Sequence, residues 1–163
     1  MPNDFYGLPL HPLIVHATAV VIPLAGLTVL VSVLWPRFRA WAGPLPMGLS
    51  LIGLILVPLS TSSGGTLENH VGASALLERH TKLADGLLPW MIGLFVVSAV
   101  AYLVHFRTRS GHTLAKPLVA VVAVLSLVAV VGTTVQVARI GHSGAQAAWD
   151  DTNMSPSSPK PTS

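Results

Sequence analysis

Every charged residue of the chain lies outside four long windows, and this distribution constrains the fold more than any other feature. The windows are 32, 28, 21 and 22 residues long and cover Phe5–Pro36, Ala40–Leu67, Gly86–Phe106 and Pro117–Ala138. A helix needs roughly 20 mostly apolar residues to cross about 30 Å of hydrocarbon. A charged residue at the bilayer centre costs about 2.5–3.5 kcal/mol. The charge map therefore predicts four transmembrane helices.

A soluble helical bundle is the alternative that this pattern must exclude. Such a bundle would carry polar residues on the outward face of each helix. The segment Leu118–Val131 is instead apolar all round and is interrupted only by Ser126. Charged residues make up 9% of the chain, against about 25% in a typical globular protein. We therefore expect an all-α integral membrane four-helix bundle whose main partner is the lipid bilayer.

The predicted spans divide the chain into one transmembrane domain and a tail. The spans cover approximately residues 13–35, 41–59, 86–104 and 117–138, within a domain over residues 1–149. The connection 64–85 is long enough for a short surface helix over Ser74–Thr81. Residues 150–163 are rich in Ser and Pro and have little to bury, so a disordered tail is expected. No internal repeat is evident.

The loops predict the orientation. Five basic residues and no acidic ones lie in the first-to-second and third-to-fourth connections: Arg37, Arg39, Arg107, Arg109 and Lys116. By the positive-inside rule these loops are cytoplasmic, so both termini of a multi-pass cell-membrane protein are non-cytoplasmic. Because the basic charge lies in these loops, it does not indicate nucleic acid. The absence of cysteine excludes disulfides, thiolate ligands and covalent haem attachment through CxxCH.

Five of the seven histidines fall at the predicted outer end of the bundle: His11, His16, His70, His80 and His142. His16 lies three residues past the start of the first span, about 4–5 Å inward by helical rise. An ionisable side chain inside a span is a functional-site hypothesis by default. A structural role, with the imidazole bonded to a neighbouring helix, remains the alternative. His70 is interpreted as solvated, and His105 and His112 as interfacial anchors.

Histidine is the commonest transition-metal ligand and a common axial ligand of haem. No pair has the spacing of an HExxH site, so any ligands come from different helices. The candidate haem ligands are His16, His80, His142 and His11, with His16 paired to His80 or His142. For a transition-metal ion the candidates are His16, His80 and His142.

A polar stripe follows one face of the fourth span. Gly132, Gln136, Arg139 and Ser143 are spaced by four, three and four residues, which places them on one helix face. We interpret the stripe as helix-to-helix hydrogen bonding, with Arg139 extending toward the outer headgroups.

Two segments resemble a known family: Leu10–Ala17, LHPLIVHA, and the closing Gly141–Ala145, GHSGA. The family is a widespread bacterial one of four-helix membrane proteins of unknown function, with an HPLxVH motif in the first helix. The likeness covers most of residues 6–149. It implies that the family's histidines are His11, His16 and His142, with His80 a looser match. Relatives fused to cytochrome-like modules imply haem or redox chemistry. This chain departs from the family at Val135–Ile140, where relatives carry an aromatic-rich stretch.

Three functions remain open on the sequence. The first is a redox protein that binds b-type haem or a transition metal through its outer histidines and works with a membrane or redox partner. The second is a non-catalytic accessory subunit that binds a partner through its outer connection. The third, ranked last because no charge lies inside a span, is a small transporter. No nucleophile elbow or phosphate-cradling glycine loop indicates an enzyme, and the oligomeric state is left open.

Overall fold

The computed structural model describes residues 4–5, 8–71 and 75–149, with side chains described for 11–65 and 75–149. The predicted tail over residues 150–163 lies outside the described residues, as does the side chain of His70.

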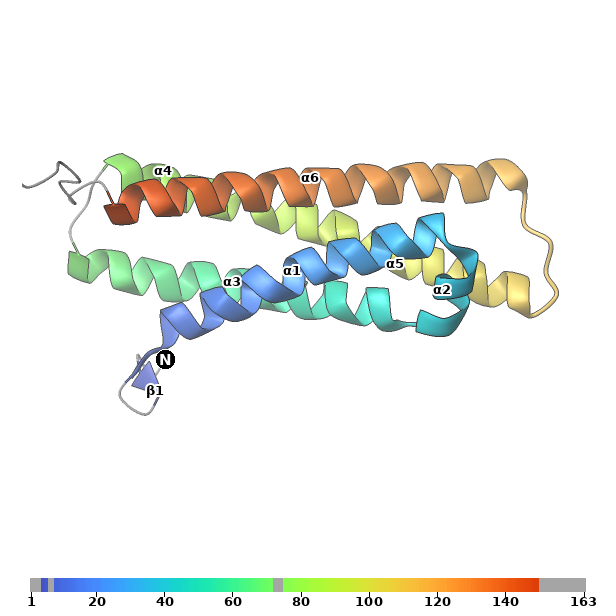
Figure 1. Ribbon diagram of the computed structural model, residues 1–163, viewed down its shortest axis with the longest axis horizontal. Coiled ribbons are helices and arrows are strands. Elements are labelled where there is room, and N and C mark those ends of the chain that lie inside the picture. The colour runs from blue at the N-terminus through green and yellow to red at the C-terminus, as the bar shows by residue number, and fades with distance from the viewer. Residues whose placement is uncertain (1–3, 6–7, 72–74, 150–163) are drawn as a thin grey trace, which may run out of the picture.

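The described chain is helical apart from a two-stranded N-terminal hairpin (Figure 1). The strands β1 (Asp4–Phe5) and β2 (Leu8–Pro9) pair antiparallel. The helices are α1 (Leu10–Leu34), α2 (Pro36–Ala42), α3 (Leu45–Val71), α4 (Ala75–Asp85), α5 (Leu87–Arg109) and α6 (Lys116–Trp149).

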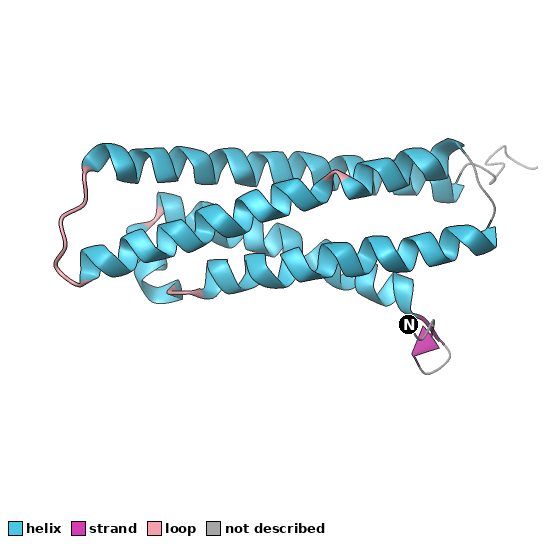
Figure 2. Cartoon of the chain, turned by 180° about the vertical axis from the view of Figure 1, so that it is seen from behind, coloured by secondary structure: helices cyan, strands magenta, loops and turns pink. Residues whose placement is uncertain are grey.

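The long helices form a bundle in which each packs mainly on two neighbours. Helix α1 packs on α3 and α6, and α5 packs on the same two helices, so α1 and α5 lie diagonally opposite. Helix α4 extends the line of α5 and packs along the end of α6 (Figures 1 and 2). The bundle therefore consists of two halves, α1–α3 and α4–α6.

Four segments are long and apolar enough to cross a membrane, which confirms the predicted membrane bundle. They are His11–Leu34, Leu45–Gly65, Ala75–Arg109 and Lys116–Trp149. The exposed surface carries large apolar side chains along all four, and the interior holds an apolar core that includes Ile22, Met91 and Leu94. Polar residues are also buried there: Thr28, Ser50, Ser98, Ser126, Thr133, Gln136 and Ser143. A soluble protein would cover its outer surface with polar and charged side chains instead.

Two helices continue well past the ends of the predicted spans. Helix α3 runs on to Val71 through the Ser-rich segment that follows Leu59. There the hydroxyls of Thr61, Ser62 and Ser63 donate to carbonyls three residues earlier in the same helix. Helix α6 passes through Gly141 and continues to Trp149. A helix, α4, lies where a surface helix was expected over Ser74–Thr81, but it continues to Asp85, packs along α6 and falls within the third candidate span.

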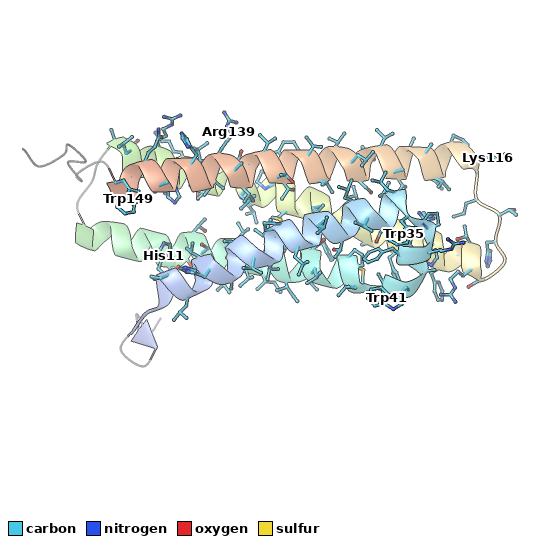
Figure 3. All side chains as sticks on the ribbon, in the orientation of Figure 1. His11, Trp35, Trp41, Lys116, Arg139 and Trp149 are labelled. Atoms are coloured by element: carbon cyan, nitrogen blue, oxygen red, sulfur yellow. The ribbon has the colours of Figure 1, made fainter. Side chains whose placement is uncertain are left out.

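The first connection turns through the short helix α2. Trp35 has an extended backbone and Pro36 opens the helix, since a proline at the first position sacrifices no hydrogen bond. Gly43 ends it with a φ of 55°, a left-handed conformation that glycine adopts without strain. Trp35 and Trp41 are both exposed at this end of the bundle (Figure 3). They lie where an aromatic belt is expected at a membrane interface.

Glycines allow close packing between the halves and within the second one. A Cβ at Gly53 of α3 would lie 2.7 Å from the Met91 methyl group of α5, so Met91 fills the space left by the glycine. A Cβ at Gly132 of α6 would lie only 1.9 Å from Cζ3 of Trp90. The Trp90 ring therefore packs directly on the backbone of α6. Small residues that admit close approach are typical of membrane helix interfaces.

Candidate functional site at the histidine end

Two histidines from different halves point into the bundle at one end, here named the histidine end and defined by His11, His16, His80 and His142. His11 lies in the first turn of α1, and His80 lies in the middle of α4. Both side chains are half-buried. His11 and His80 lie close enough for their charges to interact. The sequence placed both at this end, and the structure packs each of them against a helix of its own half.

Each of these histidines makes the same contact with a helix of its own half. His11 Nδ1 lies 3.0 Å from Ser63 Oγ on α3, and His80 Nδ1 lies 3.1 Å from Ser143 Oγ on α6. A glycine follows each serine, and a Cβ at Gly64 would lie 3.1 Å from His11 Cε1. At Gly144 the corresponding distance to His80 Cε1 is 3.0 Å. The two halves therefore repeat one arrangement of histidine, serine and glycine, which we name the histidine–serine contact.

The serine hydrogens determine which imidazole nitrogen carries the proton. Ser63 Oγ donates to the Ser60 carbonyl, and Ser143 Oγ donates to the Ile140 carbonyl. A hydroxyl has a single hydrogen, so each Oγ is left to accept a hydrogen bond from the histidine. The network therefore assigns the proton to Nδ1 in both rings. In this tautomer Nε2 carries a lone pair and is the nitrogen able to bind a metal.

His16 lies on a different face of α1. Its Nδ1 lies 2.6 Å from the Pro12 carbonyl of its own helix, and the side chain is exposed. Five residues separate it from His11, which corresponds to a rotation of about 140° around the helix. When His11 faces the interior, His16 therefore faces away from it. His16 makes no contact with His80 in the structure as described.

His142 is exposed on α6, one residue before the buried Ser143. Of the four candidate ligands, only His11 and His80 therefore face the interior. Among the described residues, no group of three or more His, Cys, Asp or Glu side chains is placed to hold a metal ion.

The polar stripe of α6 behaves largely as interpreted from its spacing. Gln136 Nε2 donates to the Leu83 carbonyl near the end of α4, at 2.6 Å. Gly132 receives the Trp90 ring and Ser143 bonds His80. Arg139 is exposed and points away from the bundle (Figure 3). Three of the four stripe residues thus join α6 to the α4–α5 segment.

Sequence reasoning missed Ser63 and Gly64, and it placed Ser143 in the polar stripe without pairing it or Gly144 with His80. The dipeptide Ser-Gly occurs three times, at Ser63-Gly64, Ser110-Gly111 and Ser143-Gly144, and only the first and third lie late in the second long helix of a half. Because the second copy lies in the connection between α5 and α6, the dipeptide alone did not reveal the repeated contact.

The chain matches one protein-family model over residues 7–154, described as a predicted membrane protein family, DUF2231. No curated protein and no solved structure matches the chain. The match covers most of the sequence and agrees with the four candidate spans. The chain therefore belongs to the DUF2231 family of predicted membrane proteins.

Proposed function

We propose that this protein is a small membrane redox protein that binds one b-type haem at the histidine end, with His11 and His80 as the axial ligands. The observation that carries the proposal is the repeated histidine–serine contact, which holds two imidazoles from different halves with Nδ1 protonated. Histidines that bind metals usually donate the other ring N–H to a fixed acceptor, which orients the ring and raises its basicity. Ser63 and Ser143 supply that acceptor here.

The ligand count favours haem over a bare metal ion. A structural or catalytic zinc site uses three or four protein ligands. No such set is present in the described residues, where only His11 and His80 of the four candidates are half-buried and bonded to a neighbouring helix. A haem brings its own four equatorial nitrogens and needs the protein only for axial ligands. Two inward histidines would suffice for a haem and would leave an isolated ion under-coordinated.

The glycines support the same assignment. Gly64 and Gly144 leave the faces of α3 and α6 flat where the two imidazoles lie. The imidazole rings occupy this space, so the glycines let the two rings lie against the helices, and a side chain at either position would displace the ring. When bound, the haem would supply one-electron chemistry, and the protein would supply the ligands, their orientation and a partly water-excluded surrounding.

A reduced-minus-oxidised absorption spectrum of the purified full chain, before and after reconstitution with haemin, tests the proposal. The expected result is a Soret band and a split visible band in the wild type, both abolished in His11→Ala and His80→Ala. His16→Ala and His142→Ala serve as matched controls, because each removes an exposed histidine from the histidine end of the bundle. A wild type without a Soret band, or a band abolished by His16→Ala, would overturn the assignment.

The proposal includes an orientation and a partner. The arginine-rich loops would face the cytoplasm, so the haem would lie at the outer surface, where a soluble or membrane-bound redox protein could exchange electrons with it. The predicted inner loops carry the five basic residues and the histidine end carries the acidic ones, which supports this direction.

A partner-binding role without a cofactor is favoured by the surface of α4. This helix has no buried residue, and it exposes Glu78, Arg79 and Lys82. Lys82 Nζ lies 2.7 Å from Glu78 Oε1, an exposed pair that contributes little to stability. Under this alternative, charge reversal at Arg79 would abolish partner binding and His11→Ala would not. The haem proposal predicts instead that His11→Ala abolishes the Soret band and that charge reversal at Arg79 leaves the band unchanged.

A further inference from the structure

The opposite end of the bundle, named the arginine end and defined by Arg37, Arg39, Arg107 and Arg109, contains two adjoining cavities. Their volumes are about 40 Å³ and 110 Å³. Both are lined by Val33, Arg39, Ala101 and His105. One water occupies about 10–15 Å³ by this kind of measure, so the larger cavity has room for several polar atoms. This end lies far from the histidine pair, and nothing below depends on the haem proposal.

Unpaired polar atoms are concentrated at these cavities. In the part of the chain that the structure describes, four buried side-chain atoms have no hydrogen-bond partner. Three of the four belong to residues that line the smaller cavity: Ser32 Oγ, Arg39 Nε and His105 Nε2. Arg39 and His105 also line the larger one. Buried polar atoms are almost always paired, so three unpaired ones at one place call for a ligand.

The chemistry of these atoms defines that ligand. An arginine guanidinium only donates hydrogen bonds, whereas serine and histidine can donate as well. The arginine end is also strongly positive, because His105 lies within electrostatic range of both Arg39 and Arg109. The loops 35–44 and 107–116 contain no acidic residue that could neutralise this charge. A ligand with several acceptor oxygens and a negative charge satisfies all three atoms.

We propose that these cavities bind a phosphate group through Arg39, His105 and Ser32. Arginine recognises phosphate well, since its planar fork can donate two parallel hydrogen bonds to phosphate oxygens. The position favours the headgroup of an anionic phospholipid as the source of the phosphate. Trp35 and Trp41 mark the interfacial depth, and the exposed side chains of Leu103 and Phe106 offer an apolar surface for the acyl chains.

The position of the two arginines on the short helix α2 explains why only one of them belongs to the proposed phosphate site. Arg37 is exposed, whereas Arg39 is half-buried and lines both cavities. The two arginines have the same charge, lie on the same seven-residue helix and differ in what they face. They therefore form a matched pair that separates a defined site from the general attraction of basic residues to anionic lipid.

Native mass spectrometry of the detergent-purified full chain tests the proposal with phosphatidylglycerol and phosphatidylcholine of identical acyl chains. The wild type is expected to retain one phosphatidylglycerol with at least 5-fold higher affinity than phosphatidylcholine. Arg39→Gln is expected to abolish this preference, and Arg37→Gln to change it less than 2-fold. Equal loss in the two variants would overturn the site, and no preference in the wild type would overturn the lipid headgroup as the source of the phosphate.

Two milder variants keep the test decisive if Arg39→Gln does not fold. Arg39→Lys retains the charge but removes the Nε–H, and Ser32→Ala removes a single oxygen. Each substitution is expected to weaken phosphatidylglycerol binding about 3-fold. Each variant protein is expected to elute in size-exclusion chromatography at the same volume as the wild type. Unchanged binding in both folded variants would contradict the proposed contacts.

Inorganic phosphate distinguishes the two sources of the ligand. Titrated into lipid-free protein, it is expected to bind weakly and to compete with phosphatidylglycerol in an Arg39-dependent manner. Arg39-dependent phosphate binding without any lipid preference would assign the site to free phosphate and support the recognition chemistry. Binding of neither phosphate nor lipid would refute it.

Discussion

Replacing Gly132 by alanine is the sharpest test of how the second half of the bundle is packed. The added Cβ would lie 1.9 Å from Trp90 Cζ3 and 2.2 Å from Cε3. Carbon atoms in contact prefer about 3.5–4.0 Å, so the Trp90 ring would have to move away from α6. Trp90 is 39% exposed, so it can move toward lipid only by giving up its contact with α6. We expect the free energy of unfolding to fall by about 1–3 kcal/mol, the usual cost of overpacking.

The same helix offers a control with the opposite sign. A Cβ at Gly141 meets nothing within 4 Å, and this position is also inside α6. Gly141→Ala is therefore expected to stabilise the protein by about 0.4–1 kcal/mol, because it restricts the unfolded chain without a clash. Equilibrium unfolding in mixed micelles, followed by tryptophan fluorescence, measures both changes.

A double variant identifies the cause. If the cost arises from the Trp90 ring, Gly132→Ala should be nearly harmless in a Trp90→Ala background, with a coupling energy of about 1 kcal/mol or more. Equal stability of Gly132→Ala and Gly141→Ala, or strictly additive effects with Trp90→Ala, would refute the described packing.

Two further predictions concern α6 and the orientation. Gln136→Leu leaves the Leu83 carbonyl without its donor and should destabilise the protein by about 1–2 kcal/mol in the same unfolding assay, whereas Thr134→Val on the exposed face should change stability by less than half as much. Ser110→Cys introduces the only thiol in a cysteine-free chain, and a membrane-impermeant maleimide should label it only after the cells are permeabilised; labelling of intact cells would reverse the predicted orientation.

The spans could be predicted from the sequence because the penalty for burying charge in lipid acts on each segment independently of its neighbours. The ends of the helices could not be predicted in the same way, because they depend on tertiary contacts between helices and not on where the charged residues lie. Helix α6 passes through Gly141 because Ser143 and Gly144 pack on His80 beyond it. A glycine that would end an isolated helix is tolerated where tertiary contacts continue on its far side.

The sequence predicted the region of the candidate site but not which histidines face inward. Topology alone brings the histidines of several helices to one end, whereas the rotation of each helix about its axis decides which of them face inward. The sequence favoured His16 because it lies deeper in the span, but His11 faces Ser63 and His16 is exposed. Their five-residue separation showed that both could not face the interior, but only the contact of His11 with Ser63 shows which one does.

The location of the hydrogen bonds has a consequence for how the chain is assembled. His11–Ser63, His80–Ser143 and Gln136–Leu83 each join helices of the same half. The halves meet through apolar contacts such as Met91 against Gly53. Each half can therefore form its polar contacts while it is inserted, before it meets the other. A gene divided in the connection between α3 and α4 should accordingly yield two fragments that find each other in the membrane, as independently inserted helices do.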